Sequence, residues 1–112
     1  MAALGDWDEV AAFAASLPGT VAGTYYGGPA IKSASSGRPV VTPSREPDSF
    51  CLHLDLDHKA MLLDVLPDRV WQTPHYAGWP AVLVRYGPDD GIGEWIGRAL
   101  ELAAARPRAR AR

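Results

Sequence analysis

The spacing of apolar residues along the chain predicts three helices. The expected helices are residues 6–17, residues 57–66, and a third that starts at Asp89 or Asp90 and ends before Pro107. Asp6 and Asp57 are the expected N-caps of the first two helices, because each precedes a run with helical spacing. The expected buried stripe of the second helix is Met61, Leu62, Val65 and Leu66.

Alternation of apolar and polar residues predicts strands between these helices. In residues 49–56, Phe50 and every second residue after it are apolar, which is typical of a strand with one face on a core. The other expected strands are residues 30–33, 39–42, 70–73 and 81–86. Residues 23–29 are rich in glycine and predict a turn. The order of elements therefore predicts an α+β domain with a mainly antiparallel sheet and helices packed on one face.

Length and composition indicate one domain. The chain has 112 residues, of which 47% are hydrophobic and 21% charged, so it can bury one core. We expect a domain over residues 1–105 and a disordered basic tail over residues 106–112. One cysteine excludes an internal disulfide framework. The chain has neither a basic N-terminal region nor a long apolar run, so we expect a cytoplasmic protein without a membrane partner.

Charge is distributed unevenly along the chain. The net charge is −2, but four of the eleven basic residues lie in the last seven positions. Residues 1–105 hold seven basic and thirteen acidic residues, which is a net charge of −6. An acidic body is not the usual electrostatic footprint of a DNA-binding domain.

Several motifs nevertheless resemble one family. They are LPG at residues 17–19, YGGPAIK at 26–32, a strand running into an aspartate at 54–57, and QTPHYAGWPAVLV at 72–84. In this order, across residues 6–105, they resemble the MmcQ/YjbR family. The resemblance implies a CyaY-like fold and non-enzymatic DNA binding through a double-wing arrangement of sheet hairpins.

Four basic residues are the candidates for contacting DNA phosphates. They are Lys32, Arg38, Arg45 and Arg85, all at strands or hairpin loops. If the hairpins align, these residues form the basic stripe on the exposed sheet face that phosphate binding requires. The alternative is an ordinary surface of mixed charge.

Aromatic residues supply a second candidate site. They cluster in residues 71–79 and at the double tyrosine: Tyr25, Tyr26, Trp71, His75, Tyr76 and Trp79. Flat rings stack on a base or on another planar ligand, so a small-molecule binding module for a planar aromatic compound is the alternative to DNA binding. In another interpretation, these rings only close the edge of the core. A third functional alternative is a protein-interaction adaptor.

Cys51, His53 and Asp55 alternate along one predicted strand face, and His58 follows. Alternate residues of a strand lie nearly 7 Å apart, at about 3.3 Å per residue, which does not favour a shared metal ion. No third group or oxyanion loop accompanies the Cys–His pair. We therefore expect no catalytic residues, no metal and no cofactor.

Overall fold

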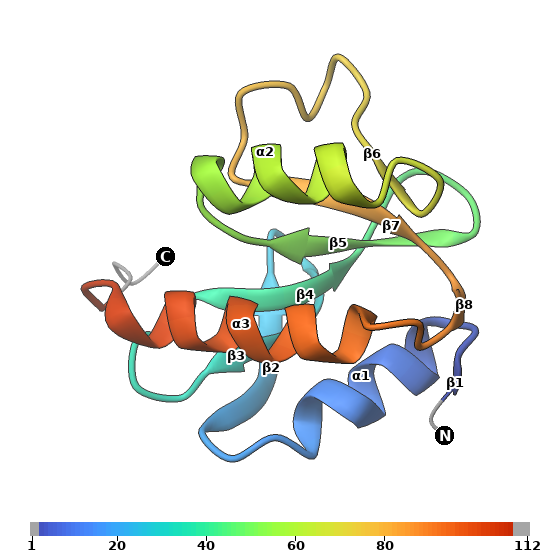
Figure 1. Cartoon of the computed structure of the whole chain (residues 1–112). Coiled ribbons are helices and arrows are strands. Elements are labelled where there is room, and N and C mark those ends of the chain that lie inside the picture. The colour runs from blue at the N-terminus through green and yellow to red at the C-terminus, as the bar shows by residue number, and fades with distance from the viewer. Residues whose placement is uncertain (1–2, 109–112) are drawn as a thin grey trace.

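The expected α+β architecture is present in the computed structural model, which describes residues 3–108 (Figure 1). In chain order the elements are β1 (Ala3–Leu4), α1 (Trp7–Ala15), β2 (Thr20–Tyr25), β3 (Gly28–Ser33), β4 (Pro39–Pro43), β5 (Ser49–His53), α2 (Leu56–Val65), β6 (Val70–Trp71), β7 (Ala81–Arg85), β8 (Gly87–Pro88) and α3 (Ile92–Ala105). Six strands form an antiparallel sheet in the order β2-β3-β4-β5-β7-β6, and β1 pairs with β8 in a second sheet. The α+β class and the antiparallel sheet are confirmed.

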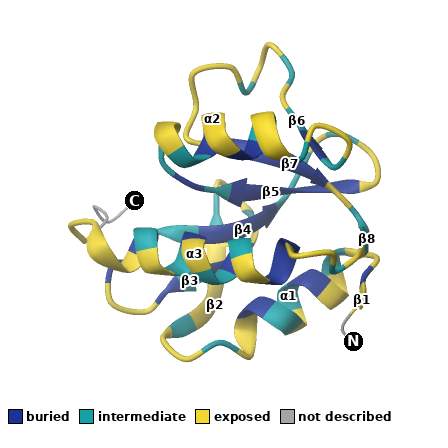
Figure 2. Ribbon diagram, in the orientation of Figure 1, coloured by how far each residue is buried: buried dark blue, intermediate teal, exposed yellow. Residues whose placement is uncertain are grey.

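One hydrophobic core joins the sheet to the helices. Alternation along β5 places the fully buried Phe50 and Leu52 in this core, and α1, α2 and α3 all contribute buried residues to it. Helices α1 and α3 contact β3 and β4, whereas α2 contacts β6 and β7. Figure 2 shows the buried residues concentrated along β4, β5 and β7. The intervening residues Cys51 and His53 consequently point to the opposite face of the sheet.

Helix α1 begins where its sequence predicts. The Asp6 side chain accepts a hydrogen bond from the Glu9 backbone N–H (2.8 Å), and the Glu9 carboxylate accepts one from the Gly5 N–H (2.9 Å). Both bonds satisfy N–H groups at or just before the first turn, which have no partner within the helix. The helix ends at Ala15, two residues earlier than expected.

The prediction of a turn over residues 23–29 is wrong, because most of these residues lie in the two strands of a hairpin. Strand β2 pairs with β3, and only Tyr26 and Gly27 connect them, with φ values of 50° and 81°. Positive φ at both central residues is the mark of a type I′ hairpin turn. Strand β2 lies at the sheet edge, and most of its side chains are exposed. Its sequence therefore lacks the alternation of apolar and polar residues by which a strand is predicted.

The start and the buried face of α2 also differ from expectation. Strand β5 ends at His53, and Asp55, not Asp57, is the N-cap that accepts the His58 N–H (2.7 Å). Met61 and Val65, expected in the core, are 51% and 54% exposed. Leu62 and Leu66 are buried or partly buried as expected, and Lys59 and Leu63 take the place of Met61 and Val65 on the inward face.

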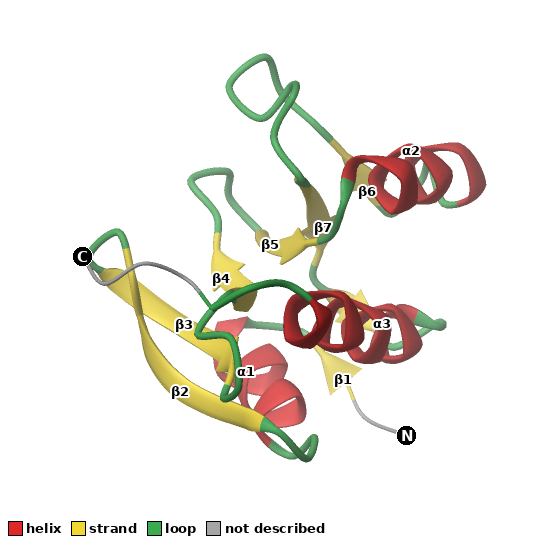
Figure 3. Cartoon of the chain, turned by 90° about the vertical axis from the view of Figure 1, so that its left-hand side faces the viewer, coloured by secondary structure: helices red, strands yellow, loops and turns green. Residues whose placement is uncertain are grey.

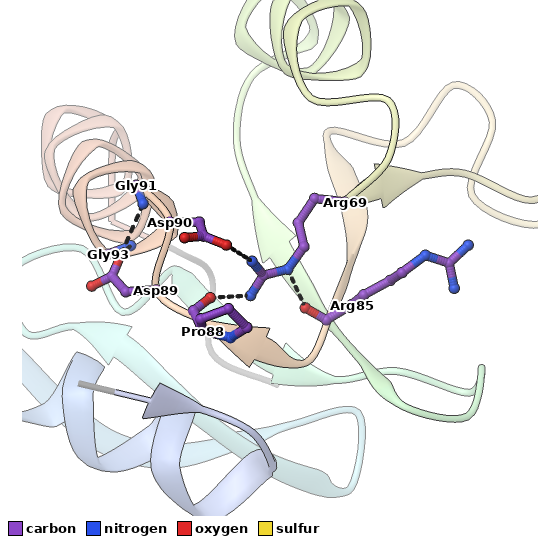
Figure 4. Close-up of polar contacts among 7 residues, drawn as sticks. All are labelled: Arg69, Arg85, Pro88, Asp89, Asp90, Gly91 and Gly93. Carbon is purple, nitrogen blue, oxygen red and sulfur yellow. Dashed lines mark hydrogen bonds and ion pairs between the residues drawn. The ribbon is translucent and has the colours of Figure 1, made fainter. Parts of the chain in front are cut away.

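Arg69 connects the end of the sheet to the start of α3 (Figure 4). Its guanidinium donates to the carbonyl oxygens of Arg85 (2.7 Å) and Pro88 (2.6 Å). The Asp89 carboxylate then accepts the N–H groups of Gly91 (3.1 Å) and Gly93 (2.9 Å). These contacts hold the segment between β7 and α3. The N-cap residue of α3, Gly91, has no side chain that could cap the helix.

The end of α3 and the first tail residues lie against the β3–β4 loop. The Arg38 Nε donates to the Pro107 carbonyl (2.8 Å), and Arg108 donates to the Ser35 carbonyl (3.0 Å). Residues 109–112 of the expected basic tail lie outside the described residues. Among the helices of residues 3–108, none combines the length and the apolar character that crossing a bilayer requires.

Candidate functional site

A pocket of about 450 Å³ opens on the sheet face that carries Cys51 and His53. Figure 3 shows the β6–β7 loop, the β4–β5 loop and the β2–β3 turn on the side of the sheet away from α2 and α3. Each of these three segments supplies residues to the pocket wall. Six of the residues expected to bind DNA or a ligand line it: Tyr25, Tyr26, Arg45, His75, Tyr76 and Trp79.

The floor of the pocket is a chain of polar side chains from two paired strands. Thr42 and Cys51 are directly opposite in the β4–β5 register, and the Thr42 hydroxyl is 2.9 Å from His53 Nε2. The Cys51 thiol is hydrogen-bonded to Thr42 and to Tyr76. The floor therefore presents hydroxyl, thiol and imidazole groups that are already joined to one another.

Burial keeps both titratable groups of the floor neutral at pH 7. It raises the pKa of the Cys51 thiol and lowers the pKa of His53 to about 4. The cysteine is thus a thiol and the histidine an uncharged imidazole, which can take part in hydrogen bonds as donor and acceptor. The floor therefore offers hydrogen-bonding groups that carry no charge.

Aromatic rings form the walls. The Tyr25 ring contacts His53 edge to face at a centroid distance of 5.5 Å, and Tyr26 at 4.6 Å. On the other wall, His75 lies nearly parallel to Trp79, with centroids 6.2 Å apart and planes 25° apart. Trp79 is 46% exposed, so part of its ring is open to solvent. The rings of two separate segments thus surround one polar floor.

Tyr76 reaches across the pocket from the β6–β7 loop to the floor and to the β4–β5 loop. Its hydroxyl is hydrogen-bonded to the Cys51 thiol and accepts the backbone N–H of Arg45. Burial raises the pKa of this hydroxyl, so it stays protonated. The tyrosine consequently holds two loops in a defined position relative to the sheet.

Lys59 of α2 holds the β6–β7 loop from its other side. Its side chain is only 4% exposed, and Nζ donates to the carbonyl oxygens of Tyr76 (2.8 Å) and Trp79 (2.6 Å). Burial lowers the pKa of the ammonium group. The sequence pattern did not predict a role for this residue, because lysine is rarely buried. The available signal was its spacing of three, four and seven residues before Leu62, Leu63 and Leu66.

The four cations expected to form a stripe do not gather in this pocket. Arg45 lines it, whereas Arg85 stacks over the Trp71 ring, 4.3 Å from the ring centroid. Lys32 faces the same side of the β2–β3 hairpin as Tyr25 but lies opposite Val21, with its side chain packed over Gly23. Trp71 likewise does not line the pocket.

Comparison with protein-family models, curated proteins and solved structures gave no match. The resemblance to the MmcQ/YjbR family therefore stays a prediction from the motifs. Among residues 3–108, no three histidine, cysteine, aspartate or glutamate side chains are grouped as metal ligands.

Proposed function

We propose that the ring-lined pocket binds a small molecule with a planar aromatic group. The observation that carries the proposal is the convergence of five rings over a hydrogen-bonded floor: Tyr25, Tyr26, His75, Tyr76 and Trp79. Small-molecule sites are typically concave, mostly apolar and equipped with a few fixed polar groups. A pocket of about 450 Å³ falls within the usual volume of such sites.

The fixed geometry of the walls favours binding. Tyr76 is hydrogen-bonded at its hydroxyl, and the loop that carries it and Trp79 is held by Lys59. Side chains that are already ordered lose little conformational entropy when a ligand arrives. The exposed part of Trp79 offers a stacking surface, and the neutral floor offers hydrogen-bond partners for a polar substituent.

Replacing Trp79 with alanine is expected to weaken binding of a neutral planar probe, N-phenyl-1-naphthylamine, by about tenfold. The expectation rests on a stacking contribution of roughly 1–3 kcal/mol per ring. Fluorescence titration of the probe measures the affinity. Trp71→Ala is the matched control, since Trp71 lies outside the pocket. Equal affinity of the Trp79 variant and the parent protein contradicts the proposal.

DNA binding, which the family resemblance implies, is the competing function. We expect no saturable binding of a DNA duplex at micromolar protein and physiological salt, because the cations are dispersed over an acidic body. Fluorescence anisotropy of a labelled duplex measures this. Saturable binding that weakens in both Lys32→Gln and Arg45→Gln would support DNA binding instead, whereas binding unaffected by either change is the non-specific attraction of basic residues elsewhere.

A further inference from the structure

A second pocket, of about 520 Å³, adjoins the ring-lined pocket. Both are lined by Tyr25, His53, Trp79 and Ala81, so these four residues form a common boundary. The second pocket extends from this boundary to the start of β4 and the C-terminal end of α3. The two pockets therefore lie side by side, with these four residues between them.

The two pockets are basic although the body of the protein is acidic. Their charged lining residues are Arg38, Arg45 and Arg106 against a single carboxylate, Asp55. All thirteen acidic residues of the chain lie within the described part, so the other twelve lie outside both pockets. This local reversal of sign favours an anionic ligand.

The single carboxylate is already engaged. Asp55 Oδ1 accepts the backbone N–H of His58 at 2.7 Å and lies 2.8 Å from His58 Nδ1. These bonds lower the pKa of Asp55, and the hydrogen bond from the His58 backbone N–H has the largest effect. The aspartate therefore serves as the N-cap of α2, and its Oδ1 interacts with the first turn of that helix.

Arg38 is positioned by the tail. Its Nε donates to the Pro107 carbonyl at 2.8 Å, which uses one of the five N–H donors of the guanidinium. Arg106, the C-cap of α3, lines the same pocket. Two arginines from distant parts of the chain thus line one cavity, and guanidinium groups suit carboxylate, sulfonate and phosphate oxygens.

We propose that the second pocket binds an anionic substituent of the ligand whose aromatic group occupies the ring-lined pocket. The ligand class is a planar aromatic acid. This inference rests on the proposed function, which it makes more specific. Arg38 and Arg106 contact the acidic group, while Trp79 and the tyrosines contact the ring system.

Two probes that differ in one acidic group test the inference. 1-Anilinonaphthalene-8-sulfonate is N-phenyl-1-naphthylamine with an added sulfonate. We expect Arg38→Gln and Arg106→Gln each to weaken binding of the sulfonate about five- to tenfold and to leave the neutral probe unchanged. Arg98→Gln is the matched control, because Arg98 is an exposed α3 arginine that pairs with Glu101 (3.2 Å) outside both pockets.

The possible outcomes separate the two proposals. Binding of neither probe, or binding of both that Trp79→Ala leaves unchanged, overturns the ring-pocket function itself. Binding of both probes that weakens in Trp79→Ala, with no effect of Arg38→Gln or Arg106→Gln on the sulfonate, overturns only the anionic pocket. An equal loss of sulfonate affinity in Arg98→Gln also overturns it, since general surface charge then explains the preference.

Discussion

Replacing Lys59 with methionine is expected to lower the free energy of unfolding by roughly 2 kcal/mol and to weaken aromatic-probe binding at least tenfold. Methionine keeps the apolar stem but removes the ammonium group that donates to the Tyr76 and Trp79 carbonyls. Burial lowers the pKa of this lysine, so relief of a desolvated charge offsets part of the loss. Urea denaturation measures stability, and probe titration measures binding.

The comparison of three variants separates positioning from stability. Lys59→Gln retains a hydrogen-bond donor, so we expect it to recover part of the affinity that Lys59→Met loses. Met61→Gln changes an exposed residue of the same helix and should affect neither quantity. If Lys59→Met binds the probe like the parent protein, the lysine does not position the Tyr76 and Trp79 wall.

Acidification from pH 6.5 to pH 4 is expected to destabilise the protein by up to about 3 kcal/mol through His53 alone. The unfolded histidine titrates near its ordinary pKa of 6.5, whereas burial lowers the folded pKa to about 4. Between these two pKa values the unfolded state binds more protons than the folded state, so stability falls as the pH falls. Urea denaturation at a series of pH values measures the slope.

The matching variant is His53→Gln, which lacks the titrating imidazole and should show a flatter profile between pH 6.5 and 4. His75→Gln is the control, because His75 is exposed in the β6–β7 loop. Asp55 contributes in a different window, since its lowered pKa makes its contribution disappear only as the pH falls below about 3.8. Parallel profiles for the parent protein and His53→Gln would show that His53 is not buried in its neutral form.

The candidate site was only partly accessible to prediction. The ring-rich segment at residues 71–79 and the double tyrosine both contribute rings to the pocket, and both are conspicuous in the sequence because their aromatic residues lie next to prolines and glycines. Trp71, equally conspicuous, lies under Arg85 outside the pocket. Which ring faces the pocket depends on strand register, and a sequence pattern does not specify partners across a sheet.

The α+β class, the antiparallel sheet and the start of α1 follow from local patterns alone. Apolar periodicity, the Asp6 cap and the helix end before Pro107 depend on a few neighbouring residues, so they can be predicted from the sequence. Tertiary contacts decided the rest: the edge strand β2, the burial of Lys59 and the adjacency of the two pockets. Strand β2 is held by its hydrogen bonds to β3, which no local pattern in its own sequence requires. Lys59 is buried because carbonyl oxygens of a loop distant in sequence accept hydrogen bonds from its ammonium group.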